Sequence, residues 1–155
     1  MEEIVKKLIL LNKTISTMES CTGGMLANEI TNIKDASRVF KFGAVTYSNE
    51  FKIKFNVDKK TIEDYGVYSE YVAKEMSYQI TKFTNSDYGI GITGKLMCQD
   101  VNNLDGENNK VYYSIYIKDT NEFINDFVLV NSNNRSNNKK MVIENIIEKL
   151  RLIIK

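Results

Sequence analysis

The sequence contains no histidine, proline or tryptophan, and it has only two cysteines, Cys21 and Cys98. Without histidine, a Ser-His-Asp triad, a Cys-His dyad and every zinc site with a histidine ligand are excluded. Two cysteines so far apart along the chain cannot supply a cysteine-rich metal site, so we expect no bound metal and no disulfide scaffold. Because the chain shows no secretion signal, we expect a reducing, cytoplasmic location.

Strong net charge and long apolar runs are also missing. The formal net charge of the 155 residues is +1, which gives no electrostatic reason to expect nucleic acid or an anionic membrane as a partner. No apolar run approaches the length that spans a membrane. Residues 1–13 read as an amphipathic helix and not as a signal peptide, because acidic residues precede the apolar segment and no small-residue cleavage site follows. The residues expected on the inward face of this helix are Ile4, Val5, Leu8, Ile9 and Leu11.

What is present is the composition of a globular domain. Hydrophobic residues make up 43% of the sequence and charged residues 26%, the usual balance for a folded protein. Short β-branched runs alternate with amphipathic helical stretches, which is the pattern of an α/β fold. We therefore expect one domain, residues 1–155, built as a three-layer α/β/α sandwich on a mixed sheet, with an antiparallel pair late in the chain.

The expected elements follow from hydrophobic periodicity and cap residues. Strands are expected over 13–18, 41–49, 87–93, 110–117 and 122–130, the last two forming a hairpin. Helices are expected over 22–33, 58–66, 69–84 and from about Arg135 to the C-terminus. The helix over 69–84 is capped by Ser69, and its apolar stripe consists of Val72, Met76, Ile80 and Phe83. The polar, aperiodic segment 95–110 follows a buried strand, so we expect a surface loop beside any functional site.

The stretch TMESCTGGM, residues 17–25, places a serine, a cysteine and a threonine before two glycines, between an expected strand and an expected helix. Such a turn holds side chains at the carboxyl edge of a sheet, where ligands prefer to bind. The helix N-terminus would offer N–H groups to a phosphate or to the oxyanion of acyl transfer. A structural interpretation fits the same residues: Thr22 caps the helix, Gly23 and Gly24 pack closely, and Cys21 is a small buried residue.

A second polar cluster lies in TYSNEFKIKF, residues 46–55, where Lys52 follows the expected strand by about one helical turn. A lysine that is desolvated beside a serine can lose its proton near neutral pH and act as a base. A Ser-Lys pair is among the few nucleophilic arrangements open to a chain without histidine. The spacing alone leaves a second interpretation open, in which Lys52 is a solvated surface lysine like its neighbours.

Four motifs in order along the chain carry a family resemblance: ESCTGG (19–24), DASRVFKFGAVTYSNEFK (35–52), GVYSEYVAKEM (66–76) and GITG (91–94). Over most of its length the sequence resembles the C-terminal domain of the CinA family, the nicotinamide-nucleotide amidase module. The resemblance implies the fold of that domain in its standalone form, with self-association as a homodimer. It also implies hydrolysis of the carboxamide of nicotinamide mononucleotide to nicotinate mononucleotide and ammonia, without a metal or organic cofactor.

The resemblance assigns the site residues motif by motif. Ser20 matches the family's nucleophile, Lys52 matches its basic partner, and Arg135 matches an active-site arginine at the start of the last helix. Arg135 is expected to bind the substrate phosphate or to lower the pKa of Lys52 by repulsion between like charges. The residues expected to bind substrate or to shape the site are Thr22, Gly23, Gly24, Ser37, Tyr47, Thr93 and Gly94.

The sequence departs from the family pattern after the TG of residues 93–94. The family usually continues with a loop of the type AGPxGG, which helps to shape the substrate pocket, whereas this sequence reads KLMCQDVNNLDG. Four functions therefore stay open: the amidase with this substrate, an amidase with a different substrate, a relative that binds a nucleotide or phosphate without cleaving it, and a structural or oligomeric partner domain. Two roles are open for Glu19, which are to orient Lys52 or to pair with Arg135.

Overall fold

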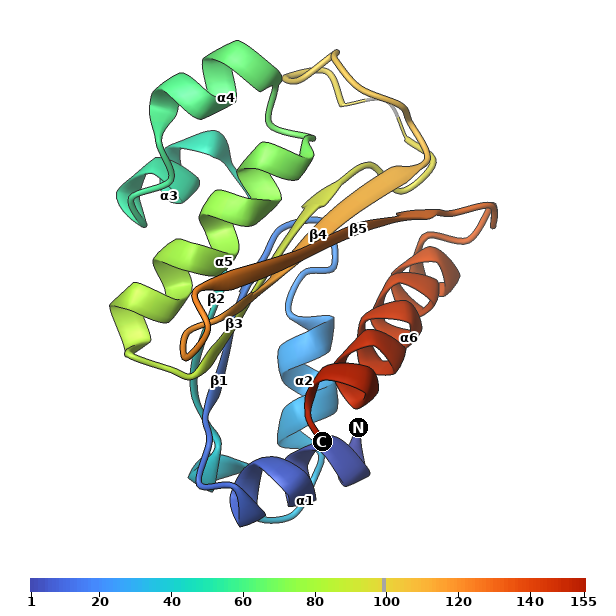
Figure 1. Ribbon diagram of the computed structural model, residues 1–155. Helices are drawn as coiled ribbons and strands as arrows, with labels where there is room; N and C mark the ends of the chain where they lie inside the picture. The colour runs from blue at the N-terminus through green and yellow to red at the C-terminus, as the bar shows by residue number, and fades with distance from the viewer. Residues whose placement is uncertain (99) are drawn as a thin grey trace.

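A five-stranded mixed sheet forms the centre of the computed structural model, which describes residues 1–98 and 100–155 (Figure 1). The strands are β1 (Ile15–Glu19), β2 (Phe40–Val45), β3 (Tyr88–Gly94), β4 (Lys110–Ile117) and β5 (Glu122–Leu129). Their order is β2-β1-β3-β4-β5, with β1 parallel to both neighbours and with antiparallel pairing from β3 to β4 and from β4 to β5. Gln99, which falls in the loop expected over 95–110, lies outside the described residues.

Helices cover both faces of the sheet, as Figure 1 shows. One side carries α3 (Asn49–Lys54), α4 (Lys59–Tyr65) and α5 (Glu70–Thr84). The other side carries α1 (Glu2–Leu10), α2 (Met25–Thr31) and α6 (Arg135–Ile153). A short 3₁₀ helix, Ala36–Arg38, precedes β2. The α/β fold on a mixed sheet, expected from the sequence, is confirmed, and none of the helices in the described part of the chain is long and apolar enough to cross a membrane.

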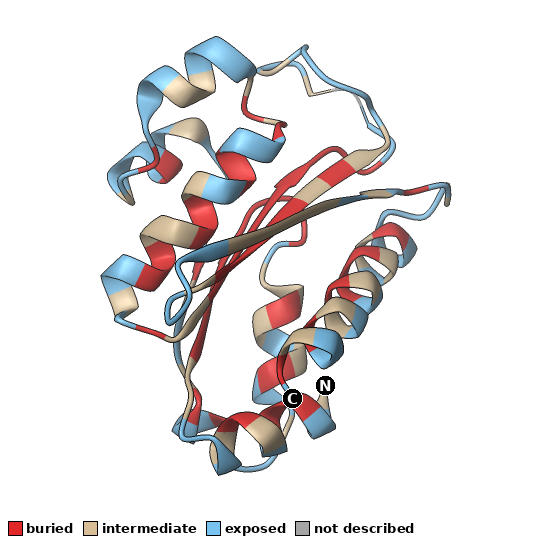
Figure 2. Cartoon of the chain, in the orientation of Figure 1, coloured by how far each residue is buried: buried red, intermediate tan, exposed pale blue. Residues whose placement is uncertain are grey.

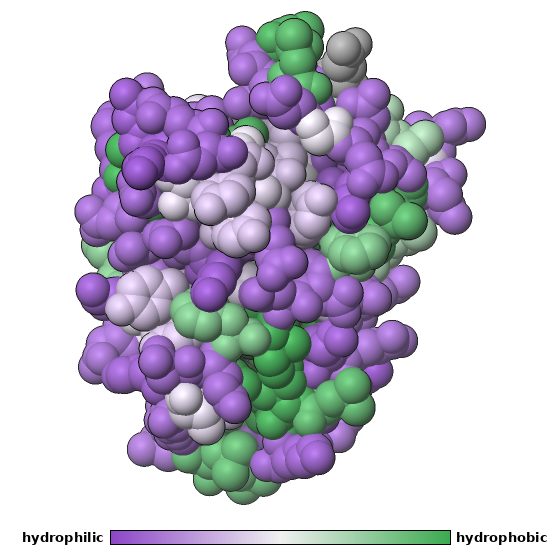
Figure 3. Space-filling view, turned by 45° about the horizontal axis from the view of Figure 1, so that its top comes forward, coloured by the Kyte–Doolittle hydropathy of each residue, from purple (hydrophilic) through white to green (hydrophobic). Residues whose placement is uncertain are grey.

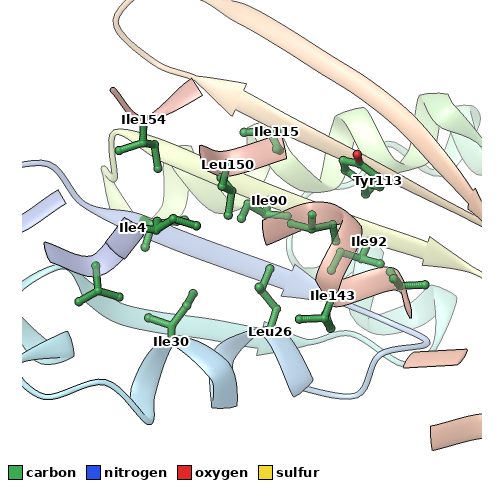
Figure 4. Packing of buried hydrophobic residues seen from close by; sticks show 14 of the residues in the cluster. Ile4, Leu26, Ile30, Ile90, Ile92, Tyr113, Ile115, Ile143, Leu150 and Ile154 are labelled. Carbon is green, nitrogen blue, oxygen red and sulfur yellow. The ribbon is translucent and has the colours of Figure 1, made fainter. Parts of the chain in front are cut away.

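Hydrophobic side chains fill the spaces between the layers. The larger cluster joins the sheet to α1, α2 and α6 (Figure 4), and its members include Ile4, Leu26, Ile90, Ile92, Tyr113 and Leu150. The smaller cluster lies beneath α5 and includes Met18, Val72, Met76 and Ile80. The central strands β1 and β3 are buried along almost their whole length (Figure 2). The carboxyl end of β1, which leads into ESCTGG, is therefore anchored from both faces.

Cap residues explain where the later helices begin. Ser69 accepts a hydrogen bond from the N–H of Val72 at 3.3 Å, as the sequence predicts for α5. Asn134 accepts from the N–H of Asn137 at 3.0 Å, and α6 begins at Arg135. These side chains satisfy N–H groups that a helix N-terminus leaves without partners.

The helix expected over 22–33 begins three residues later than predicted, at Met25. Gly23 and Gly24 have φ values of 65° and 91°, so the chain makes a left-handed turn before the helix can start. Thr22 is therefore not the cap of this helix. That prediction was wrong because the glycines continue the turn and do not belong to the helix.

Two apolar side chains are more exposed than their periodicity predicts. Leu11 is 45% exposed, because α1 ends at Leu10 and the positive φ of Asn12 turns the chain away. Phe83 is 62% exposed at the last turn of α5, although its ring centroid lies 5.2 Å from that of Phe42. The apolar stripe of α5 thus ends in an aromatic contact with the edge strand β2 and not in the core.

Candidate active site

An open cleft of about 890 Å³ is lined by the residues that follow the parallel strands β1, β2 and β3. Ser20 lines it directly after β1. The Ser20 N–H donates to the carbonyl of Ile92 at 3.0 Å, and the Thr46 N–H donates to the carbonyl of Glu19 at 2.8 Å. These bonds continue the sheet pairing on both sides of the turn, so they fix the backbone that carries the Ser20 hydroxyl.

The short helix α3 brings Lys52 to Ser20. The sequence predicted a strand as far as Asn49, but β2 ends at Val45 and Ser48 caps α3 by accepting from the N–H of Phe51 at 3.3 Å. Lys52 lies on the inner face of this helix and is 1% exposed. Its Nζ is 3.1 Å from Ser20 Oγ, across 32 residues of sequence. The interpretation of Lys52 as a solvated surface lysine was therefore wrong.

Burial lowers the pKa of Lys52 to about 8. The ammonium form loses its water on burial, and no carboxylate forms a salt bridge with it among residues 1–98 and 100–155. The nearby charge of Asp100 acts in the opposite direction and raises this pKa. Desolvation is therefore what lowers the pKa of Lys52. Repulsion by Arg135, which was one of the two roles expected for that residue, does not contribute to the lowering. Nζ also donates to the Thr46 carbonyl at 2.8 Å, which orients the amine beside the serine.

Glu19 holds the turn that follows Ser20. Its carboxylate is fully buried and accepts the Thr22 hydroxyl at 2.6 Å. The same carboxylate accepts the backbone N–H groups at the start of α2, at 2.9 to 3.2 Å, from Gly24, Leu26 and Ala27. The protein's own carboxylate therefore occupies the helix N-terminus. The expectation that these N–H groups bind a phosphate or an oxyanion was wrong, because Glu19 already accepts them.

Neither role that was open for Glu19 is observed in the described residues, since its carboxylate bonds to the turn and not to Lys52 or Arg135. The Gly23 N–H is also used, by the carbonyl of Ser20 at 3.0 Å. Within the described parts of the chain, no oxygen lies in hydrogen-bonding position for the N–H groups of Cys21 and Thr22. These two backbone donors come directly after Ser20.

Cys21 belongs to the hydrophobic core, although it also borders the cleft. Burial raises its pKa to about 12, so the thiol stays protonated at neutral pH. The thiolate is the nucleophilic form of cysteine. Ser20, and not Cys21, is therefore the nucleophile that this geometry favours.

Arg135 and Tyr47 line the same cleft from distant parts of the sequence. Arg135 is the first residue of α6, and its Nη2 donates to the Tyr47 hydroxyl at 3.1 Å. No carboxylate pairs with this guanidinium among the residues that the structure describes. A guanidinium has five N–H donors, so most of them remain available to an anionic ligand.

Several residues predicted for substrate binding do not line the cleft. Thr93 is buried, and its hydroxyl donates to the carbonyl of Val67 at 2.9 Å. Thr22 is buried and bonds to Glu19, while Gly23 and Gly24 form the left-handed turn, so these three residues shape the site from behind.

Ser37 also lies away from the cleft. It is exposed in the 3₁₀ helix before β2, whereas the cleft lies after the end of β2, so the length of the strand separates them. The remaining predicted residue, Gly94, does line the cleft.

The second cleft wall comes from the described part of the 95–110 loop, and the sequence did not indicate which of its residues line the cleft. The Asn49 side-chain amide donates to Asn103 Oδ1 at 2.9 Å and so ties α3 to this loop. The amide of Asn103 and the hydroxyl of Tyr68 both donate to Asp100 Oδ2. The polar composition of the loop was the only sequence signal, and it did not identify individual residues.

Lys95 secures the base of this loop. It is almost fully buried, and its Nζ donates to the carbonyls of Leu104 at 3.1 Å and Gly106 at 3.5 Å. The same amine lies 5.2 Å from the centre of the Tyr68 ring. The face of the molecule shown in Figure 3 is mostly hydrophilic, with hydrophobic atoms in separate patches. Lys95 thus ties the loop by polar bonds, next to Leu96, which is packed in the core.

The chain is similar to known proteins in sequence. The family model described as CinA C-terminal domain matches residues 1–153. Over 96 residues the chain is 50% identical to a competence-damage inducible protein of Thermoanaerobacter pseudethanolicus and 51% identical to one of Clostridium perfringens strain SM101. Each match covers 61% of this chain and 23% of the relative, so the chain spans about a quarter of the length of these curated relatives.

Solved structures share the fold. A CinA superfamily protein from Klebsiella pneumoniae superimposes with a TM-score of 0.88 at 22% identity, covering 99% of this chain and 94% of that one. A competence/damage inducible protein from Agrobacterium tumefaciens gives 0.85 at 22% identity, covering 99% and 95%. At these identities the likeness shows the fold alone, whereas the family-model match spans almost the whole sequence. The chain belongs to the CinA C-terminal domain family.

Proposed function

We propose that the protein is an amidase that hydrolyses the carboxamide of nicotinamide mononucleotide, releasing nicotinate mononucleotide and ammonia. The observation that carries this proposal is the 3.1 Å contact between Ser20 Oγ and the buried amine of Lys52. An amine with a pKa of about 8 is partly neutral near physiological pH and can accept the serine proton. A serine activated by a lysine is an established variant of hydrolytic catalysis.

In the proposed first step, Ser20 Oγ attacks the carbonyl carbon of the amide while neutral Lys52 takes the hydroxyl proton. The oxyanion of the tetrahedral intermediate accepts a hydrogen bond from the N–H group of Cys21, which lines the cleft and which the fold leaves without an oxygen acceptor in the described residues. Protonated Lys52 then gives its proton to the amide nitrogen, the C–N bond breaks, and ammonia leaves. Water activated by the same amine cleaves the ester bond to Ser20 and releases the acid.

The remaining cleft residues bind the rest of the substrate in this proposal. Arg135, oriented by Tyr47, binds the phosphate through its remaining N–H donors. A cleft of about 890 Å³ is within the range of small-molecule sites and can hold a mononucleotide. An amidase with a different substrate is the second candidate, and the observation that favours it is the loop wall built by Asp100 and Lys95.

The test is to incubate the purified protein with nicotinamide mononucleotide and to measure ammonia and nicotinate mononucleotide. Ser20→Ala and Lys52→Met are each expected to lower the rate by roughly 10²–10⁴-fold. The matched controls are Ser37→Ala and Lys54→Met, because the first residue lies away from the cleft and the second is an exposed residue of the same helix. Both controls are expected to retain the rate.

The rate is expected to rise with pH and to level off above about pH 8, since the neutral form of Lys52 is the base. Unchanged ammonia release from a folded Ser20→Ala protein would contradict the nucleophile assignment. Thermal stabilisation by the nucleotide without any turnover would instead identify a binding protein.

A further inference from the structure

Arg135 reaches the cleft from the first position of α6, so its location depends on how that helix begins. The segment before it, residues 131–134, has no regular secondary structure and is mostly exposed, between the buried Val130 and the helix. An irregular surface segment is mobile unless its backbone groups are bonded. A guanidinium at the end of such a segment therefore needs a further contact that holds it beside Tyr47.

Asn138 supplies this contact from within the helix. Its side chain is fully buried, its Oδ1 accepts the Ser132 N–H at 2.9 Å, and its Nδ2 donates to the Ser132 carbonyl at 2.7 Å. One side-chain amide thus satisfies both backbone groups of one residue. The two bonds join residues 132 and 138 and close a ring of chain that has Arg135 at its centre.

Further hydrogen bonds within this ring fix the start of the helix. The Asn134 N–H donates to Ser132 Oγ at 3.0 Å, and Asn134 Oδ1 accepts from the Asn137 N–H at 3.0 Å. The Asn138 N–H donates to the Asn134 carbonyl at 3.1 Å. Ser132, which Asn138 holds, therefore orients the cap residue that directly precedes Arg135.

An amide at position 138 is unfavourable for the helix itself. Asparagine has a low helix propensity, and a buried amide loses its water. The bonds to Ser132 offset these costs, whereas an apolar residue would avoid them. A local conflict of this kind is expected where a site needs a fixed geometry. The other buried residues of α6 are all apolar: Val142, Ile143, Ile146 and Leu150.

The body of α6 is fixed relative to the proposed nucleophile. Its buried apolar residues belong to the core cluster that also contains Cys21. Lys139 Nζ lies 3.1 Å from the position that a Cβ atom would take at Gly23, so the helix also approaches the turn after Ser20. Because the helix body is anchored in this way, the ring from 132 to 138 determines where Arg135 lies relative to Ser20.

We infer that Asn138 is a positioning residue for Arg135. By holding Ser132 it fixes the start of α6, so that the guanidinium lies beside Tyr47 at the cleft, although Asn138 itself does not line the cleft. The use of Arg135 to bind substrate rests on the proposed function, whereas its position rests on the hydrogen bonds around Ser132.

The direct test measures how mobile the Arg135 guanidinium is, by ¹⁵N relaxation of its Nε–H group without any ligand. The chain has three arginines, Arg38, Arg135 and Arg151, so their signals are readily assigned. Asn138→Val removes both bonds to Ser132 and keeps a buried side chain of similar size. We expect the order parameter of the Arg135 group to fall from the range of ordered groups to below about 0.6.

Asn145→Val is the matched control, because Asn145 lies on the same helix and its Oδ1 accepts the Tyr113 hydroxyl at 2.7 Å. It is expected to leave the order of Arg135 unchanged. Asn138→Ala removes the same bonds as Asn138→Val without a branched side chain and should give the same result, with thermal unfolding to verify that each variant is folded. An Arg135 that stays ordered in the folded Asn138 variants, or that is already mobile in the wild-type protein, would overturn the inference.

A kinetic test follows from the proposed reaction. Asn138→Val is expected to raise the KM for nicotinamide mononucleotide about tenfold and to change kcat by less than about twofold, because part of a charge-assisted hydrogen bond is lost. In an Arg135→Ala background, the same substitution should have no further effect on KM. Equal effects of Asn138→Val in both backgrounds would show a merely structural role and overturn the inference.

The two tests separate this inference from the proposed function. A protein that releases no ammonia from nicotinamide mononucleotide would refute the proposed hydrolysis, and the mobility of Arg135 would still decide the role of Asn138. A protein that hydrolyses the nucleotide but keeps Arg135 ordered without Asn138 would do the opposite.

Discussion

The two walls of the cleft are stabilised in different ways. On the first wall, Glu19, Ser20 and Lys52 are buried, and each makes hydrogen bonds within the protein. On the second wall, the loop exposes apolar side chains such as Val101 and Leu104 and is tied to the domain by side-chain amides and one buried lysine. The difference teaches that burial fixes Ser20 and Lys52, the residues proposed to react, whereas the loop wall depends on a few polar bonds near the surface.

The largest effect is expected from removing the carboxylate that organises the first wall. Glu19→Ala leaves three backbone N–H groups and the Thr22 hydroxyl without their acceptor. An unsatisfied buried donor costs about 1–3 kcal/mol, so we expect the free energy of unfolding in urea to fall by at least about 3 kcal/mol. Glu29→Ala, on the same helix, is the control with an expected change below about 0.5 kcal/mol. Equal, small changes in both variants would mean that the first wall is not organised by Glu19.

Lys52→Met, on the same wall of the cleft, is expected to affect stability and function in opposite directions. The lowering of the Lys52 pKa from 10.5 to about 8 corresponds to about 3 kcal/mol of unfavourable burial at pH 7. Lys52→Met removes this cost and so raises the free energy of unfolding. The lost hydrogen bond to the Thr46 carbonyl lowers it again by about 1 kcal/mol. We therefore expect the variant to be more stable by about 2 kcal/mol at pH 7, while the proposed amidase rate falls.

The extra stability of Lys52→Met is expected to decrease as pH rises. Between about pH 8 and 10.5 the unfolded lysine binds more protons than the folded one, so the wild-type protein becomes more stable as pH rises. The advantage of Lys52→Met should therefore shrink over this range and disappear above it. Urea unfolding at several pH values measures it, with Lys54→Met as the exposed control. A constant difference at all pH values would show that Lys52 is not desolvated.

The smallest effect is expected on the second wall. Asn49→Ala removes the hydrogen bond to Asn103 that ties the loop to α3. We expect the free energy of unfolding to fall by only about 0.5–1 kcal/mol, while amide hydrogen exchange rises within the 95–110 loop and stays unchanged in β1 and β3. Asn102→Ala is the control, because with the described residues Asn102 makes a hydrogen bond through its backbone N–H and none through its side chain. Faster exchange in the sheet would show that the two walls are not independent.

The strands and the long helices were predictable because their signals are local and repeated. The hairpin of β4 and β5 and the helix capped by Ser69 were predicted within one residue of their observed ends. Helix α3 was missed because six residues are too few to display a helical period, and the strand before it ends earlier than its apolar pattern indicates. Ser37 was placed at the site by resemblance, and the direction of β2 carries it away.

The sequence by itself determined which chemistry is open to this protein, because the lack of histidine excludes the usual bases and leaves lysine beside serine. It also determined the order of elements, since hydrophobic periodicity is written along the chain. Only the tertiary structure decided that Lys52 is buried against Ser20 and that hydrogen bonds from Tyr68 and Asn103 lower the pKa of Asp100. The physical reason is that desolvation and Coulomb energy depend on distances through space, and residues far apart in sequence set those distances.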